Sequence, residues 1–328
     1  MTRRRGLALL AVLLLAAVII AVLVGETPLR AADYLAALMR PGSAPGEILW
    51  TIRAPRAAMA ALIGAALGLS GAALQGLLRN PLADPGVLGV SASAGLGAGL
   101  AIALGLAAIP GAIEASALVG ALVAGALVVA LAARFREPET LILLGVSISA
   151  FAGALSSLVY NLSPSPVTTA EVLSWMLGSV ANRGWSDLLT TAIPAALGAV
   201  LVAWSARGLT MLTLGEETAA LSGLPMARLR AAAVGGAALL AGASVAAAGI
   251  IGFVGLAAPH LVRRFSGDDP GKTLLPSALA GAVLLVLADL AARVIPTEQE
   301  LKLGVVTALF GAPLFALVAW RAARSWRS

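Results

Sequence analysis

Long apolar runs alternate with short polar segments along the whole chain. The runs lie near residues 6–25, 55–78, 87–109, 112–133, 140–162, 187–206, 231–251, 253–264, 273–292 and 303–320. Most hold about 20 residues with few or no charges, which at about 1.5 Å per residue spans a hydrocarbon core of about 30 Å. The pattern predicts an all-α polytopic membrane protein with about ten transmembrane helices in a single domain, residues 1–328.

The seventh and eighth runs are almost continuous. Residues 231–262 carry almost no charge, and one straight helix of this length would be about 48 Å long, more than a bilayer needs. The stretch from Gly249 to Gly255 is a natural break. We therefore expect a helix, a turn and a short helix that ends at Arg263 and Arg264.

Basic residues favour ten spans with both termini in the cytoplasm. This arrangement puts 15 of the 22 lysines and arginines on the cytoplasmic side, in keeping with the positive-inside tendency. Nine spans would place the basic tail, Arg321–Arg327, on the outer side. The first run is longer than the apolar part of a signal peptide and lacks a small-x-small cleavage site, so we expect it to be a retained span.

Composition agrees with a membrane protein and excludes several kinds of site. Hydrophobic residues make up 60% of the chain and charged residues 12%, with a mean hydropathy of +0.97, which a soluble domain of this size would not tolerate. There is no cysteine and one histidine, His260, so thiolate and multi-histidine metal sites are excluded. We expect no metal site, no cofactor and no nucleic-acid partner.

The second run has well-marked ends. Pro55 suits the first position of a helix, and N-P-L-A-D-P-G at residues 80–86 is expected to stop that helix and turn the chain back into the membrane. Arg56 would then lie in the first helical turn, where the helix dipole disfavours a cation by about 0.3–1 kcal/mol. An anionic group should compensate it.

Three arginines, Arg53, Arg56 and Arg293, are expected on the outer side. Two interpretations of them stay open. They could be held structurally, by lipid headgroups or by an ion pair between Arg293 and Asp289 four residues earlier. Alternatively, they form a docking site for an acidic partner, where charge pairs set orientation and encounter rate.

The chain carries no evident energy source of its own. Gly267–Thr273 resembles a phosphate-binding loop, but three residues separate its glycines where the motif has four, so we expect a cytoplasmic turn. The cores of the spans hold almost no ionisable side chains, which weighs against a proton-driven carrier. A proton- or ion-coupled secondary transporter remains the alternative, because a faint inverted repeat relates residues 56–71 to residues 230–247.

Six motifs, in this order, resemble those of the FecCD-like, or type II, ABC importer permeases. They are R-A-P-R (Arg53–Arg56), Q-G-L-L-R-N-P-L-A-D-P-G-V-L-G-V (Gln75–Val90), L-G-E-E-T-A (Leu214–Ala219), G-F-V-G-L-A-A-P-H (Gly252–His260), A-D-L-A-A-R (Ala288–Arg293) and T-A-L-F-G-A-P-L-F (Thr307–Phe315). The resemblance covers the chain from about residue 45 to its end. It implies a type II permease fold in a bacterial inner membrane, and a conduit rather than an enzyme.

The resemblance also implies partners and residue roles. Two permease copies, expected as a homodimer surrounded by membrane lipid, would line one path for a ferric siderophore, haem or cobalamin. Two separate ATPase subunits would drive it, and a periplasmic binding protein would deliver the substrate. The residues that match family sites are Arg53, Arg56 and Arg293 for docking; Asn80 and Leu82 for the cytoplasmic gate; and Leu214, Gly215, Glu216, Ala219 and Gly223, within the amphipathic connection 207–230, for coupling to the ATPase.

Three positions depart from the family pattern. The second gate segment reads E-P-E-T at residues 137–140 instead of being rich in serine and threonine, so its gating role is open. The usual E-L-P-[VI]-G is E-L-K-L-G at residues 300–304, which adds Lys302 to the docking face. Ser222 replaces a usual leucine. Oxyanions such as molybdate are also carried by similar permeases, so the substrate itself is not specified by this sequence.

Overall fold

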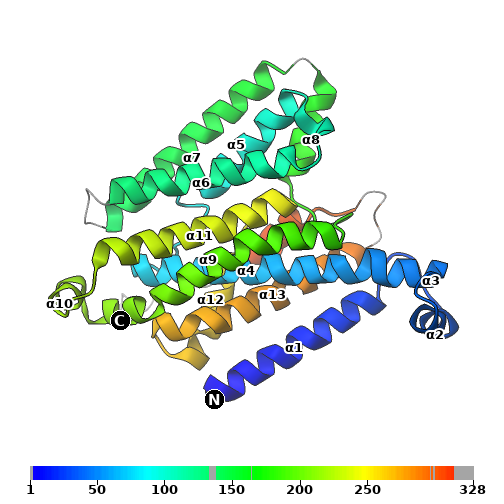
Figure 1. Ribbon diagram of the computed structural model, residues 1–328, viewed down its shortest axis with the longest axis horizontal. Coiled ribbons are helices and arrows are strands. Elements are labelled where there is room, and N and C mark those ends of the chain that lie inside the picture. The colour runs from blue at the N-terminus through cyan, green and yellow to red at the C-terminus, as the bar shows by residue number, and fades with distance from the viewer. Residues whose placement is uncertain (1–2, 133–137, 164, 296, 298–299, 314–328) are drawn as a thin grey trace.

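The computed structural model describes residues 3–132, 138–163, 165–295, 297 and 300–313. Every regular element in these ranges is helical. Most of the helices run along the long axis of the molecule, with α2 and α3 at one end and α10 at the other (Figure 1). We call these the α3 end and the α10 end.

The long helices occupy the predicted apolar runs. Their bounds are α1 (Arg3–Leu23), α4 (Ala54–Leu78), α6 (Ala112–Ala132), α7 (Pro138–Asn161), α9 (Trp185–Met211), α11 (Met226–Ala248) and α13 (Pro270–Val294). The shorter helices are α2 (Ala31–Met39), α3 (Ala44–Glu47), α5 (Val90–Ala103), α8 (Pro166–Met176), α10 (Glu216–Leu221), α12 (Val254–Ser266) and a last helix, Leu303–Pro313. Single turns lie at η1 (Ile48–Arg53), η2 (Leu106–Ala108) and η3 (Leu212–Leu214).

The predicted all-α class is confirmed, and each of the ten apolar runs contains a helix. Within the described ranges, seven helices are long and apolar enough to cross a membrane. The runs at α5 and α12 form shorter helices of 14 and 13 residues. The tenth run is described as far as residue 313, and the basic tail at Arg321–Arg327 lies outside the described residues.

The expected break between α11 and α12 is present. Gly249 has φ +71°, and a Cβ atom built there would lie 2.2 Å from the carbonyl oxygen of Trp175. Phe253, at φ +67°, then leads into α12. Glycine is therefore required at position 249 both by its backbone conformation and by the close approach of the end of α8.

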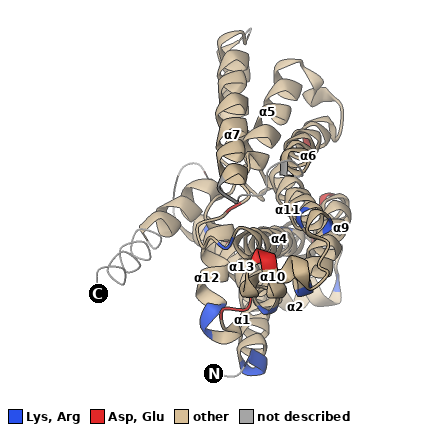
Figure 2. Cartoon of the chain, turned by 90° about the vertical axis from the view of Figure 1, so that its left-hand side faces the viewer, with Lys and Arg blue, Asp and Glu red and all other residues tan. Residues whose placement is uncertain are grey.

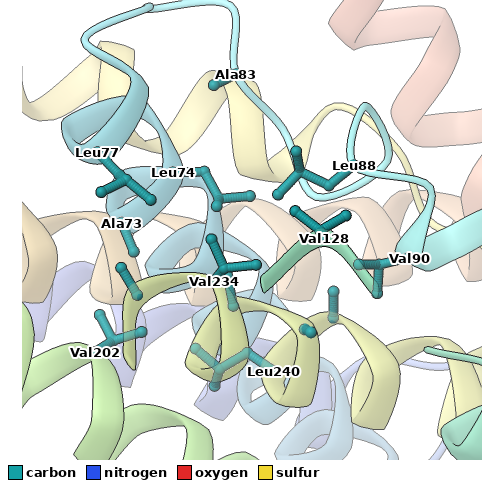
Figure 3. Close-up of a cluster of buried hydrophobic side chains, with 14 of the residues drawn as sticks. Ala73, Leu74, Leu77, Ala83, Leu88, Val90, Val128, Val202, Val234 and Leu240 are labelled. Atoms are coloured by element: carbon teal, nitrogen blue, oxygen red, sulfur yellow. The ribbon is translucent and has the colours of Figure 1, made fainter. Parts of the chain in front are cut away.

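The centre of the molecule is formed by α4, α11 and α13. Backbones touch where α4 crosses α13, because a Cβ atom at Gly64 would lie 2.3 Å from the carbonyl oxygen of Gly281. On the other side of α4, Leu74 belongs to an apolar cluster with Val234 of α11 and Val202 of α9 (Figure 3). Small residues thus let the helices approach closely, as is typical of membrane helix packing.

The α5, α6 and α7 helices form one side of the bundle (Figure 1). In the most apolar 18-residue stretch of α7, 17% of the residues are buried, whereas 83% are buried in the corresponding stretch of α11. Leu143, Phe151 and Leu158 are exposed along α7. This helix therefore presents most of its apolar surface to whatever surrounds a single chain.

Candidate docking, gate and coupling sites

The segment before Pro55 is helical, which corrects one step of the sequence argument. The chain is helical without interruption from residue 44 to residue 78, and η1 is a π-helical turn whose last bond runs from the Ala54 amide to the Leu49 carbonyl. Proline has no N–H and its ring clashes with the carbonyl four residues earlier in an α-helix, so the wider turn accommodates Pro55. Arg56 therefore does not lie at a free helix N-terminus, and the helix dipole does not by itself call for an anionic partner there.

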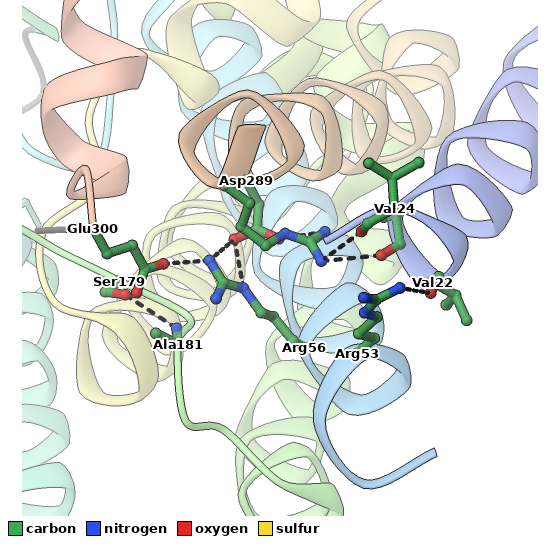
Figure 4. Close-up of polar contacts among 10 residues, drawn as sticks. Val22, Val24, Arg53, Arg56, Ser179, Ala181, Asp289 and Glu300 are labelled. Atoms are coloured by element: carbon green, nitrogen blue, oxygen red, sulfur yellow. Dashed lines mark hydrogen bonds and ion pairs between the residues drawn. The ribbon is translucent and has the colours of Figure 1, made fainter. Parts of the chain in front are cut away.

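Arg56 is instead compensated by carboxylates of its own chain (Figure 4). Its Nε and Nη2 atoms both donate to Asp289 Oδ1, at 3.0 and 2.8 Å, and Nη2 also donates to Glu300 Oε1. Asp289 lies in the last turns of α13 and is completely buried, whereas the Glu300 side chain is 25% exposed. Two carboxylates from distant segments thus meet one guanidinium of α4.

Asp289 also lies beside Arg293. Its Oδ2 atom is 3.0 Å from Arg293 Nη2, so the expected ion pair one helical turn apart is present. The Nη1 atom of Arg293 donates to the carbonyl oxygens of Ala21 at 3.0 Å and Val24 at 3.3 Å. Asp289 is therefore shared by two arginines.

Arg53 is held by backbone oxygens at the end of α1. It donates to the carbonyls of Leu23, at 2.7 Å, and Thr27, and its guanidinium lies so close to Gly25 that a Cβ atom there would be 2.7 Å from Nε. The last carbonyls of a helix lack intrahelical partners and carry the negative end of its dipole. The end of α1 therefore contributes to neutralising both Arg53 and Arg293.

The sequence prediction brought together Arg53, Arg56 and Arg293, and these three do gather at the α3 end. Each is buried, with at most 8% of its surface exposed. Together with Asp289 and Glu300, the three arginines form a group with a net charge of one positive unit. Sequence reasoning missed Glu300 and the end of α1 as partners, because neither a distant carboxylate nor a helix-end carbonyl leaves a local motif.

Two backbone segments pack closely together next to Glu300. The amides of Leu303 and Gly304, which begin the last helix, donate to the carbonyls of Gly178 and Leu177, at 2.9 and 3.0 Å. A Cβ atom at Gly304 would lie 2.4 Å from the Leu177 oxygen. The last helix is thus fastened at its start to the connection between α8 and α9.

Asn80 and Leu82 lie in the turn that follows α4. The helix ends at Leu78 as the Asn-Pro pair predicted, and Asn80 Oδ1 accepts a hydrogen bond from the Leu82 amide at 2.9 Å. The Leu82 side chain is 47% exposed. A cavity of about 220 Å³ beside this turn is lined by Gln75, Arg79, Pro81, Arg263 and Asp268 among others. The gating role of this turn stays a prediction. In the second gate segment, residues 137–140, Glu137 lies outside the described residues.

The predicted coupling connection forms a protrusion at the α10 end. Gly215, at φ +97° and ψ 151°, separates η3 from α10, and Gly223, at φ +84°, follows α10. Glu216 Oε1 accepts a hydrogen bond from Arg230 Nη2. Ala219 is buried against the bundle, whereas Leu214 is exposed. Viewed from this end, the acidic residues at the start of α10 stand out, and basic residues mark several other elements (Figure 2).

The turn at residues 267–269 caps α13. Asp269 Oδ1 accepts hydrogen bonds from the Lys272 amide at 3.2 Å and from Thr210 Oγ1 at 2.6 Å, and Oδ2 forms an ion pair with Lys272 Nζ at 2.8 Å. Burial by itself raises the pKa of the Asp269 carboxyl, but the bonds from Lys272 and Thr210 outweigh it and hold the pKa below its usual value. Nowhere do the described residues hold a group of three or more His, Cys, Asp or Glu side chains suited to a metal ion.

Comparison with known proteins places this arrangement among transporters. The profile of the FecCD transport family matches residues 13–321. The chain is 41% identical to the uncharacterized ABC transporter permease protein YvrB of Bacillus subtilis, over 86% of this chain and 81% of the relative. It is 38% identical to the vitamin B12 import system permease protein BtuC of Salmonella typhimurium, over 98% and 96%.

A solved structure shares the same fold. It is described as an inward-facing conformation of a metal-chelate type ABC transporter, and it matches with a TM-score of 0.84 at 30% identity. The match covers 97% of this chain and 99% of the other. The likeness thus extends over both the α3 end and the α10 end.

Proposed function

The chain belongs to the FecCD transport family, and from this premise we propose how its two ends serve import. It is the membrane-spanning permease of an ABC importer, a multi-pass membrane protein of the kind that works with ATPase subunits and a substrate-binding protein. We assign ATP hydrolysis to separate ATPase subunits and delivery of the substrate to a periplasmic binding protein. The permease itself forms the conduit.

The proposed substrate is a metal chelate: a ferric siderophore, haem or cobalamin. The observation that carries this proposal is the similarity to a vitamin B12 permease over nearly the full length of both chains. A cavity of about 600 Å³ between the end of α8, the turn after α11 and the last helix is lined by apolar residues and glycines. An uncharged lining suits a bulky chelate that must pass without being held by fixed charges.

We place the α10 end in the cytoplasm, together with both termini, and the membrane is the bacterial inner membrane. Basic residues are seen from this end (Figure 2), in keeping with the positive-inside tendency. Arg3–Arg5 begin α1, Arg228 lies in the first turn of α11, and Arg263 and Arg264 lie in the last turn of α12. The exposed leucines and small residues around α10 would then meet the ATPase subunits. The α3 end, with its buried arginines, faces the periplasm.

A second copy of the chain completes the proposed conduit. The exposed apolar face of α7 and the open cavity beside the last helix are surfaces that a single chain leaves uncovered. We propose a homodimer in which both copies line one path, with membrane lipid around the remaining apolar helices. Two copies would also present two α10 protrusions to two ATPase subunits.

Transport in proteoliposomes tests the function. The permease, reconstituted with its ATPase and binding protein, should accumulate cobalamin or a ferric siderophore only when ATP is supplied on the α10 side. A permease reconstituted without the ATPase is the matched control. Uptake driven by a proton gradient in the absence of ATP would contradict the proposal and favour a secondary transporter.

Docking at Arg53, Arg56 and Arg293 has its own test. We expect Arg56→Glu to abolish binding of the periplasmic protein, and a basic substitution of one acidic residue on that protein to restore it. Arg183→Glu is a suitable control, since Arg183 lies at the same end and pairs with Glu114 at 3.0 Å. Equal binding by wild type and Arg56→Glu would remove the docking role.

A further inference from the structure

The two carboxylates on Arg56 are held in different ways. Asp289 is fully buried on a helix, accepts from both Nε and Nη2 of Arg56, and lies beside Arg293. Glu300 belongs to the non-helical segment before the last helix, and its side chain is one quarter exposed. Of the two, Glu300 is the carboxylate that can leave Arg56 without emptying a buried site.

We propose that Glu300 occupies, on Arg56, the position that a carboxylate of the binding protein takes during docking, so that the two exchange. This inference rests on the docking function proposed above. Arg56 is itself buried, and Asp289 closes the Nε edge of its guanidinium. An incoming acidic side chain therefore reaches Arg56 most directly along the Nη2 position that Glu300 now holds.

Exchange also keeps the charge balance of the buried group. A guanidinium deprived of its partner in a buried site is costly, because the uncompensated charge is poorly solvated. Replacing one carboxylate by another leaves Arg56 paired throughout and leaves the Asp289 contacts with Arg56 and Arg293 intact. An internal carboxylate on Arg56 would then act as a competitor, which lowers the affinity for the partner and prevents acidic proteins that bind weakly from docking.

Release of Glu300 would be felt at the start of the last helix. Glu300 precedes Leu303 by three residues, and the amides of Leu303 and Gly304 are fastened to the carbonyls of Gly178 and Leu177. While Glu300 is bound, the same segment is tied to α4 as well as to the connection after α8. Docking therefore removes the attachment through Glu300 of a helix that borders the apolar cavity.

The test is the affinity of the ligand-free binding protein for the permease–ATPase complex in lipid nanodiscs. Glu300→Gln and Glu300→Ala should each tighten binding about tenfold, because each removes a competing charged hydrogen bond. Glu114→Gln is the matched control, since it takes the same charge from the same end but from the pair with Arg183, and its affinity should stay that of wild type. Unchanged or weaker binding by the Glu300 variants overturns the exchange, as does equal tightening by Glu114→Gln.

Arg56→Glu separates this inference from the function on which it rests. If Arg56→Glu binds as wild type does, the proposed docking at Arg56 is wrong. If Arg56→Glu loses binding while Glu300→Gln does not bind more tightly, only the proposed exchange is wrong.

Hydrogen exchange provides a second measurement of the release of Glu300. Compared with wild type alone, the amides of Leu303 and Gly304 should exchange faster in wild type with the binding protein and in Glu300→Gln without it. Equal protection in these three samples would contradict the release of Glu300.

Discussion

Arg56 and Asp289 are 233 residues apart in the chain and meet inside the protein, where two nitrogens of the arginine donate to one carboxylate oxygen of the aspartate. The pair joins α4 to α13, the two helices whose backbones also touch at Gly64 and Gly281. Arg293 lies on the other oxygen of Asp289. One carboxylate thus fixes the positions of two arginines at the end of the bundle where docking is proposed.

Asp289→Ala should destabilise the protein by about 3–5 kcal/mol, because it leaves Arg56 and Arg293 buried with too little negative charge nearby. Unfolding in mixed micelles of a mild detergent and SDS measures this change. Asp289→Asn keeps an acceptor oxygen but removes the charge, so we expect a smaller loss in the same direction.

Glu114→Gln provides the contrast for Asp289→Ala. Glu114 pairs with Arg183 at 3.0 Å with 39% of its side chain exposed, and partly exposed pairs contribute at most about 1 kcal/mol. If Asp289→Ala and Glu114→Gln lowered stability equally, Asp289 would not be the residue that holds the buried arginines.

Gly64→Ala should force α4 and α13 apart. The added Cβ atom would lie 2.3 Å from the carbonyl oxygen of Gly281, and a backbone atom cannot move aside as a flexible side chain can. We expect a loss of about 1–3 kcal/mol in the free energy of unfolding, measured in the same micelles.

Gly153→Ala in α7 is the control for Gly64→Ala. Nothing lies within 4 Å of a Cβ atom at Gly153, so alanine should be neutral or stabilise the helix by up to about 1 kcal/mol. A Gly64→Ala protein as stable as Gly153→Ala would show that the crossing is loosely packed.

The helices were predictable because they depend on local signals. Each of the ten apolar runs contains a helix, Asn80 and Pro81 marked the end of α4, and the glycines from Gly249 marked the break before α12. The partners of the arginines were not predictable in the same way. Arg56 and Glu300 are separated by 244 positions, and no periodicity relates two such residues until the helices between them have packed.

Two further features depend on the backbone rather than on residue type. The carbonyl groups at the end of α1 hold Arg53 and Arg293, yet every helix ends in such carbonyls, so the sequence does not single these out. The π-helical turn before Pro55 extends the helix back to residue 44, whereas proline more commonly marks a helix start. Both features changed how the arginines are compensated, and neither changed which arginines gather.

Asp269 predicts a pH dependence of stability. Its pKa is lower in the folded protein than its usual value, so its contribution is present in full above about pH 3.9 and is lost as the pH falls through the folded pKa. Wild type should therefore lose stability as the pH falls below about 4, in part through this group. Asp269→Asn keeps an acceptor for the cap of α13 but does not titrate, so its stability should fall less steeply over the same pH range.

Asp269→Ala completes the comparison. It removes the cap itself and should cost about 1 kcal/mol at pH 7, where Asp269→Asn loses only the charge and costs less. Thermal unfolding in detergent at pH 7, 4 and 3 measures all three proteins. Identical pH profiles for wild type and Asp269→Asn would mean that the hydrogen bonds from Lys272 and Thr210 do not favour the charged carboxylate.

Gly215→Ala should uncouple ATP hydrolysis from transport. Gly215 joins η3 to α10 at φ +97° and ψ 151°, a region that is essentially confined to glycine and costs other residues about 1–3 kcal/mol. Alanine would relieve this strain by redirecting α10, which in the proposed importer contacts the ATPase. We expect substrate uptake per ATP hydrolysed to fall in proteoliposomes, because a redirected α10 would no longer fit its contact with the ATPase. Gly267→Ala is the matched control, because Gly267 has φ +66° and ψ −172° at the same end but lies in the turn before α13. Equal losses in Gly215→Ala and Gly267→Ala would assign the effect to backbone strain at that end in general, whereas a loss confined to Gly215→Ala identifies α10 as the element that transmits ATPase closure.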